Sequence, residues 1–140
     1  MKIYLAHAFD ARHKVKEWQE SLDLPNHTFI NPFYDIERDD IDKIDHLGIS
    51  RRNIEDGTWI ADPEKIVKRD IRALYLCCTI MVLLDSNKTI GTHMEMTYAY
   101  LGGLNVHAIC EASEFHPWVQ YHATTTFLSL DEYTEYLKEI

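Results

Sequence analysis

Cysteine is scarce, and the few cysteines form no metal-binding or disulfide pattern. The three present, Cys77, Cys78 and Cys110, make no C-x-x-C pair and lie in apolar, strand-like stretches. An odd number of such residues indicates reduced core thiols and argues against a disulfide framework or a zinc site. H-E-x-x-H and G-x-G-x-x-G motifs are also missing, and the eight histidines show no paired ligand spacing. We therefore expect no metal ion and no cofactor.

Positive charge and long apolar runs are lacking as well. The chain has 14 Lys and Arg residues against 23 Asp and Glu residues, for a formal net charge of -9. Because an acidic domain repels a phosphate backbone, we expect no nucleic-acid polymer as a partner, although a local pocket of donors can still bind a small anion. No apolar run approaches the roughly 20 residues that span a bilayer. The amino-terminal MKIYLAHAFD lacks the pattern of a signal peptide, so we expect a cytoplasmic protein without membrane contact.

The composition is that of an ordinary folded domain. Hydrophobic residues make up 46% of the 140 residues and charged residues 26%, which excludes disorder as the main state. The length suits one domain, and no repeat divides the chain. We therefore expect residues 1–140 to form a single domain.

Short apolar runs alternate with helical patterns along the chain. Strands are predicted at residues 2–6, 27–30, 79–84, 105–110 and 124–130. The third run, TIMVLL, is β-branched and fully apolar, which is typical of a central parallel strand. Helices are predicted at residues 11–22, 63–75 and 92–101, with a last helix ending at residue 140. The residues expected to cap the first, second and last of these helices at their N-termini are Asp10, Asp62 and Asp131. Gly102 and Gly103 are expected to end the third helix. Residues 35–62 are expected to form a mobile, partly helical insertion, and residues 111–123 an irregular aromatic segment.

This alternation predicts an α/β fold. We expect a flavodoxin-like three-layer sandwich whose five-stranded parallel sheet has the order 2-1-3-4-5. In such sheets, ligands bind beyond the carboxyl ends of the strands, at the switch point between strands 1 and 3. The rule nominates residues 7–12 and 85–91 as ligand-binding loops.

Two carboxylates occupy positions that invite a functional interpretation. Asp70 falls on the apolar stripe of its helix, four residues after Ile66 and four before Leu74. Glu95 lies one turn into the helix after the third strand, with apolar and small neighbours at helical spacing. Asp70 could instead be an ion-paired residue at the edge of the stripe, and Glu95 a solvent-facing one. If both converge on one pocket, they fit glycosidic bond chemistry, in which one carboxylate attacks the anomeric carbon and another acid assists the leaving group.

Three segments carry a resemblance to a known family. They are MKIYLAHAFD, VKRDIRALYLCCTIMVLLDS and TIGTHMEMTYAYLGGLNVHAI, with a G-x-x-x-E pattern from Gly91 to Glu95. In these segments the sequence resembles the nucleoside 2-deoxyribosyltransferase family, which includes the 2′-deoxynucleoside 5′-phosphate N-hydrolases. Residues 64–110 and 1–10 carry the resemblance, and residues 35–60 and 111–123 do not.

The resemblance implies an enzyme that cleaves an N-glycosidic bond. Glu95 would be the nucleophile that forms a covalent deoxyribosyl-enzyme, and the sugar would then pass to another base or to water. Asp70 would assist proton transfer at the nucleobase or orient the sugar, and Tyr4 would lie near the nucleophile. Further contacts with the nucleoside or nucleotide are expected from His7, Phe9, Asn31, Phe33, Thr89, Gly91 and His93.

Some of these residues allow more than one interpretation. Thr89 stands where the transferases of the family usually carry an aspartate for the sugar 5′-hydroxyl, and a threonine there favours a 5′-phosphate, which an aspartate would repel. His7 can contact base or phosphate, or cap the end of its strand. Asn31 and Phe33 can bind a nucleobase, or form a turn with a core aromatic.

The family also implies a homodimer or a larger homo-oligomer. An aromatic cluster of Phe115, His116, Trp118 and Tyr121 could form such an interface or a pocket lid, and we favour the interface. Because a fold does not determine a function, a different class stays open, namely a non-catalytic nucleotide-binding or sensor domain on the same scaffold.

Overall fold

Five parallel strands form one sheet in the order β2-β1-β3-β4-β5. The computed structural model describes residues 1–45, 48–84, 89–112 and 115–140. The strands are β1 (Lys2–Ala6), β2 (Thr28–Ile30), β3 (Thr79–Leu83), β4 (Asn105–Ile109) and β5 (Thr125–Phe127). Each neighbouring pair is parallel, and Tyr4 of β1 pairs with Ile30 of β2 and with Ile80 of β3. The predicted fold class and strand order are confirmed.

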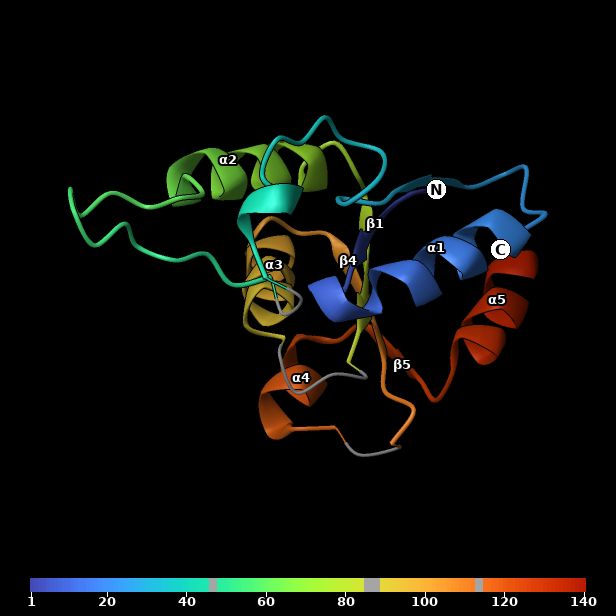
Figure 1. The fold of residues 1–140 in the computed structure, drawn as a ribbon. Coiled ribbons are helices and arrows are strands. Elements are labelled where there is room, and N and C mark those ends of the chain that lie inside the picture. Colours follow the sequence, from blue (N-terminus) through green and yellow to red (C-terminus); the bar gives the residue numbers. More distant parts are fainter. Residues whose placement is uncertain (46–47, 85–88, 113–114) are drawn as a thin grey trace.

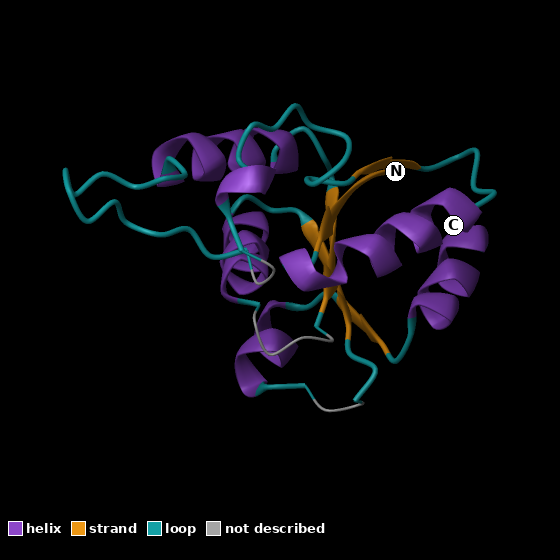
Figure 2. Cartoon of the chain, viewed as in Figure 1, coloured by secondary structure: helices purple, strands orange, loops and turns teal. Residues whose placement is uncertain are grey.

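Helices cover both faces of this sheet and complete three layers (Figures 1 and 2). They are α1 (Arg12–Ser21), α2 (Pro63–Leu74), α3 (Ile90–Leu101), α4 (Pro117–His122) and α5 (Leu130–Lys138), with short 3-10 turns η1 (Phe9–Ala11) and η2 (Ile41–Lys43). Helices α1 and α5 bury Trp18 and Tyr133 against one face. On the other face, α2, α3 and α4 bury Leu74, Met96 and Val119.

Alternation along β1 decides which layer each of its side chains enters. Successive residues of a strand point to opposite faces of a sheet. Ile3 and Leu5 accordingly pack with α1 and α5, whereas Tyr4 and Ala6 pack with α2 and α3. The fully buried phenol of Tyr4 therefore reaches the layer whose helices carry both of the carboxylates singled out in the sequence.

Capping chemistry sets two helix boundaries as predicted. The Asp62 side chain accepts hydrogen bonds from the backbone N–H groups of Glu64 and Lys65 at the start of α2. Pro63 occupies the first helical position, where its missing N–H is not needed. Beyond the end of α3, Gly103 has a φ of 79°, a left-handed conformation that glycine adopts without strain.

Two predicted caps are wrong. Asp10 lies in η1, and α1 begins only after Ala11, whose side chain makes no capping bond. At α5, the hydroxyl of Ser129 accepts from the backbone N–H of Glu132, so Ser129 is the cap in place of Asp131. Leu130, the first residue of α5, is buried in the core.

Two segments outside the main pattern differ from expectation. Residues 117–122, predicted to be irregular, form α4, which the ring of His116 caps by accepting from the N–H of Trp118. In the predicted insertion at residues 35–62, the described residues hold no helix longer than η2 and only two isolated bridges. The end of this segment extends away from the sheet beyond α2 (Figure 1).

The three cysteines are free. Cys77 and Cys110 are buried, as predicted for core thiols, whereas Cys78 is exposed. The prediction is therefore wrong for Cys78, because its apolar context does not reveal that it stands just before β3, at the rim of the sheet.

None of the helices in the described parts of the chain combines the length and the apolar character that crossing a membrane requires.

A buried histidine makes the fold sensitive to acid. His107 lies in β4 and is 3% exposed, with its Nδ1 at 3.0 Å from the hydroxyl oxygen of Tyr133. Burial lowers the pKa of His107 from 6.5 to about 4. Between these values the unfolded chain binds more protons than the folded one. The stability that neutral His107 provides is therefore present above about pH 6.5 and is lost as the pH falls toward about 4.

Between about pH 7 and pH 4, the free energy of unfolding should decrease less for His107→Gln than for the wild-type protein. The difference between the two decreases should be roughly 1–3 kcal/mol. Glutamine keeps a polar group near Tyr133 and binds no proton. Urea unfolding over this pH range measures the difference, with His13→Gln, at an exposed position, as the matched control. If the free energy of unfolding had the same pH dependence in His107→Gln and His13→Gln, the result would contradict a neutral, buried His107.

Candidate active site

A cavity of about 180 Å³ lies where the chain leaves β1 and β2, against α2 and α3. It is lined by His7, Ala8, Phe9, Phe33, Arg38, Asp40, Ile44, Gly48, Ile66, Asp70, Gly91, Thr92 and Glu95. A larger groove, of about 530 Å³, follows charged side chains on the outside of α2 and includes neither Asp70 nor Glu95. We place the candidate active site in the smaller cavity because both carboxylates border it.

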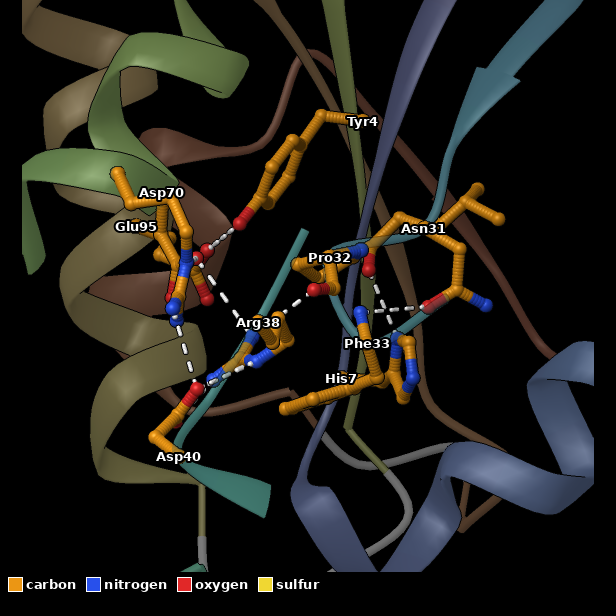
Figure 3. A network of polar contacts seen from close by, with 11 residues as sticks. Tyr4, His7, Asn31, Pro32, Phe33, Arg38, Asp40, Asp70 and Glu95 are labelled. Atoms are coloured by element: carbon orange, nitrogen blue, oxygen red, sulfur yellow. Dashed lines mark hydrogen bonds and ion pairs between the residues drawn. The ribbon is translucent and has the colours of Figure 1, made fainter. Parts of the chain in front are cut away.

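The central contact of the site joins Tyr4 to Glu95 (Figure 3). Glu95 lies in the second turn of α3, partly buried, and borders the cavity. The hydroxyl of Tyr4 donates a hydrogen bond to Oε2 of Glu95. Burial, followed by the negative charges of Glu95 and Asp70, raises the pKa of Tyr4 well above its usual value. The phenol therefore keeps its proton near neutral pH and stays a hydrogen-bond donor.

The surroundings of Glu95 disfavour its charged form. Removal of water from the carboxyl group, together with the negative charge of Asp70, raises the pKa of Glu95 to about 8. The hydrogen bond from Tyr4 and the positive charge of Arg38 act in the opposite direction. Near neutral pH the side chain therefore exchanges between acid and carboxylate forms, which is a property of reactive carboxyl groups.

Asp70 reaches the same cavity from α2, and two arginines contact its Oδ1. Nε of Arg69 donates to this oxygen at 3.3 Å, and Nη1 of Arg38 lies 3.6 Å from it. The side chain of Asp70 is 19% exposed, and burial raises its pKa in spite of both arginines. The carboxylate on the apolar stripe of α2 thus borders a cavity and is ion-paired as well.

Aromatic side chains form a wall of the cavity next to β1. The ring of Phe33 meets those of His7 and Phe9 edge to face, at centroid distances of 5.0 and 5.3 Å. His7 is buried, and its Nδ1 lies 2.7 Å from the carbonyl oxygen of Leu5. Of the predicted substrate contacts, the structure brings these three residues and Gly91 to the cavity.

The other three predicted contacts do not border the cavity. Asn31 is buried in the turn after β2, where its Nδ2 donates to Gln19 and its Oδ1 accepts from the backbone N–H of Phe33. These contacts agree with the turn interpretation of Asn31. The hydroxyl oxygen of Thr89 lies 2.9 Å from Nδ1 of His93, so these two side chains engage each other.

Sequence reasoning missed Arg38 and Asp40. Both stand after β2 in an acidic segment whose composition suggested only an irregular insertion. The rule that ligands bind beyond the carboxyl ends of strands could have nominated this segment, because β2 lies next to β1. Ala8 lies in the nominated loop at residues 7–12, and the remaining lining residues that were not predicted are Ile44, Gly48, Ile66 and Thr92.

Gly48 packs closely against the aromatic wall. Its φ is 78°, and a Cβ at this position would lie 2.9 Å from Cβ of Phe9. Only glycine permits both this backbone conformation and this approach. No pattern in the sequence links positions 9 and 48, because the contact exists only in the folded chain.

The polar groups of the site suit acid, base and nucleophilic chemistry. A carboxylate that accepts a hydrogen bond from a phenol can attack an electrophilic carbon, and a second carboxyl group with a raised pKa can donate a proton to a leaving group. Within the described residues, no group of three or more His, Cys, Asp or Glu side chains is arranged to hold a metal ion. Residues 85–88 of the predicted loop at 85–91 lie outside the described residues.

Three solved structures share this fold. A 2-deoxyribosyltransferase from Bacillus psychrosaccharolyticus has 18% sequence identity and a TM-score of 0.66, over 97% of this chain and 92% of that chain. A conserved protein from Enterococcus faecalis V583 has 16% identity and a TM-score of 0.68, over 99% and 98%. A CMP N-glycosidase from Clostridium botulinum has 15% identity and a TM-score of 0.62, over 99% and 98%. The names of the first and third are consistent with the family that the sequence motifs resemble.

No protein-family model and no curated protein sequence matches the chain. At 15–18% identity, the structural likeness establishes the shared fold. The assignment of chemistry to this chain therefore depends on its own site.

Replacement of Glu95 by glutamine is expected to stabilise the fold. Because the pKa of Glu95 rises from 4.5 to about 8 on folding, its ionisation opposes folding from about pH 4.5 upward, and the cost levels off above about pH 8. The free energy of unfolding of Glu95→Gln should exceed that of the wild-type protein by about 1–3 kcal/mol at pH 8 and by almost nothing at pH 4. Urea unfolding at the two pH values measures this gain, with the exposed Glu17→Gln as control. A gain that is the same at both pH values would rule out the raised pKa.

Proposed function

We propose that the protein is an enzyme of the nucleoside 2-deoxyribosyltransferase family, which cleaves the N-glycosidic bond of 2′-deoxynucleosides or of their 5′-monophosphates. The observation that carries this proposal is the convergence of Glu95, Asp70 and Tyr4 from α3, α2 and β1. The motif resemblance and the fold shared with a 2-deoxyribosyltransferase and a CMP N-glycosidase support it.

Glu95 is the nucleophile in this mechanism. A carboxylate oxygen attacks C1′ of the sugar, and a bond from C1′ to this oxygen forms as the bond from C1′ to the base nitrogen breaks. The electron pair of the broken bond moves to the base, which takes up a proton. Water or another base then attacks C1′ and passes a proton to Asp70, while the bond from C1′ to the Glu95 oxygen breaks and Glu95 leaves as a carboxylate. A 2-deoxy sugar reacts readily because it has no electron-withdrawing hydroxyl group beside C1′.

In the first step, Asp70 assists the departure of the base and Tyr4 assists the attack by Glu95. The pKa of Asp70 is raised by burial, which suits an acid that donates the proton to the departing base. Tyr4 donates to Oε2 of Glu95, so Oε1 is the oxygen that attacks. Since this hydrogen bond stabilises the carboxylate form, Tyr4 favours the reactive state of Glu95.

The aromatic wall suits a nucleobase. A planar heterocycle packs well against aromatic side chains, and Phe9, Phe33 and His7 present such surfaces beside the carboxyl groups. Thr89 contacts His93 and does not line the cavity. The test therefore includes both nucleosides and their 5′-monophosphates as substrates.

Incubation with 2′-deoxynucleosides and 2′-deoxynucleoside 5′-monophosphates, with and without an acceptor base, should release free base or form a new nucleoside. Chromatography measures both products. Glu95→Gln and Glu95→Ala should lower the rate by more than about a thousand-fold, because no other group takes over the attack on C1′. Glu17→Gln, which removes an exposed carboxylate from α1, should leave the rate unchanged.

The possible outcomes separate the two function classes. A folded Glu95→Gln that keeps the wild-type rate would remove Glu95 as the nucleophile. Binding of a deoxynucleotide to the wild-type protein without any release of base would favour the non-catalytic sensor.

Pairing of two copies through α3 and α4 is a second part of the proposal. Trp118 and Tyr121 on α4 are 70% and 71% exposed, and the ring of Tyr121 contacts Tyr100 of α3 at a centroid distance of 5.7 Å. Such an aromatic patch on a surface is typical of an interface. Of the other two members of the predicted cluster, Phe115 packs against the core and His116 caps α4.

The double variant Trp118→Ser/Tyr121→Ser should be monomeric under conditions in which the wild-type protein forms a dimer or larger oligomer. Size-exclusion chromatography with light scattering measures the mass. Leu128→Ser, which removes an exposed apolar side chain elsewhere, is the control and should keep the wild-type mass. A wild-type protein that is monomeric at high concentration would refute the pairing.

A further inference from the structure

The segment after β2 brings a buried guanidinium to the candidate active site. The side chain of Arg38 is 5% exposed. Its Nε and Nη2 donate to the two oxygens of Asp40 at 3.1 and 2.7 Å, and its Nη1 donates to the carbonyl oxygen of Pro32 at 2.9 Å. The guanidinium carbon lies 4.9 Å from the ring centroid of Phe33. A two-pronged ion pair with a third hydrogen bond fixes the plane of the Arg38 side chain.

This fixed guanidinium is linked to Asp70 (Figure 3). Nη1 of Arg38 lies 3.6 Å from Oδ1 of Asp70, and Nε of Arg69 donates to the same oxygen. Asp40 connects the two arginines, since its Oδ1 also accepts from Nη1 of Arg69 at 3.1 Å. Both arginines contact Oδ1 of Asp70, and Asp70 itself lines the cavity.

The charges of this cluster balance only when one carboxyl group is neutral. Arg38 and Arg69 supply two positive charges, whereas Asp40, Asp70 and Glu95 supply three negative charges when all are ionised. Arg38 is the cation that favours the ionised form of Glu95. It therefore acts on both carboxyl groups of the proposed mechanism.

Arg38 lines the cavity, but each nitrogen of its guanidinium already has a partner within the protein. Asp40, Pro32 and Asp70 already engage its guanidinium, and its side chain is almost completely covered. An arginine held in this way acts through the groups that it touches.

We propose that Arg38, held by Asp40, is a positioning residue that orients Asp70 toward the cavity and places a fixed positive charge beside the carboxyl groups that line it. The kinetic consequence rests on the proposed function, whereas the electrostatic consequence does not. The inference also gives a role to the segment after β2, which shows no resemblance to the family.

Carbon-13 NMR of the side-chain carboxyl groups, titrated in the ligand-free protein, tests the electrostatic consequence. Arg38→Met should raise the titration midpoint of Glu95 by about one pH unit or more. Arg38→Lys keeps the charge without the two-pronged contact and should restore part of the shift. Arg72→Met, which removes an exposed arginine from α2, is the matched control and should leave the midpoint unchanged.

If Arg38→Met does not fold because Asp40 has lost its two-pronged partner and keeps only Arg69, the double variant Arg38→Met/Asp40→Leu removes both buried charges of the pair together. The midpoint of Glu95 is still the readout, since Arg38 is the cation that acts on it. An unchanged midpoint in either folded variant overturns the inference, whether or not the wild-type protein is active.

The base-release assay tests the kinetic consequence. At pH 7, Arg38→Met should lower kcat by about ten-fold with little change in KM, and the acid limb of kcat/KM should move to higher pH. An effect confined to KM would show substrate binding and would overturn the positioning role. A wild-type protein that releases no base, with the Glu95 midpoint still shifted in Arg38→Met, refutes the proposed function and supports the electrostatic inference.

Discussion

The burial of the Glu95 carboxyl group against the phenol of Tyr4 is the contact on which the candidate site depends. A carboxylate removed from water and placed near a second carboxylate, Asp70, is costly to ionise, and the raised pKa of Glu95 expresses that cost. The surrounding groups reduce this cost without removing it, because Tyr4 donates a hydrogen bond and Arg38 supplies a positive charge. Strongly perturbed pKa values of this kind cluster at functional sites, which is why the proposed function is built on this contact.

The fold makes this contact possible through the geometry of parallel strands. Side chains of β1 alternate between the two layers, so Tyr4 enters the layer of α2 and α3 while its neighbours Ile3 and Leu5 enter the other. The strand order places β1 between β2 and β3. The segments that leave these three strands therefore lead to one edge of the sheet, where Arg38, Asp70 and Glu95 meet.

Local signals predicted much of the fold and singled out two carboxylates that border one cavity. The alternation of short apolar runs with amphipathic patterns, combined with the general rules for connecting parallel strands, led to the correct strand order. Asp62 caps α2 as expected, because a helix cap depends on residues close in sequence. Asp10 and Asp131 were wrong as caps, because Asp10 lies in the preceding 3-10 turn and the hydroxyl of Ser129 caps α5. Glu95 and Asp70 could be singled out because each carboxylate stands where its neighbours are apolar.

The amino-acid sequence by itself determined the layers, the order of the strands and the two acidic residues that stand out from apolar surroundings. The layers follow from periodicities that a short window of residues contains, the strand order follows from the general rules for connecting parallel strands, and the two acidic residues stand out against their immediate neighbours. Only the tertiary structure decided that Arg38 and Asp40 support Asp70, that Gly48 packs on Phe9, and that Asn31 turns away from the cavity. These contacts join segments far apart in the chain or depend on the path of an irregular loop, and such pairings leave no local pattern.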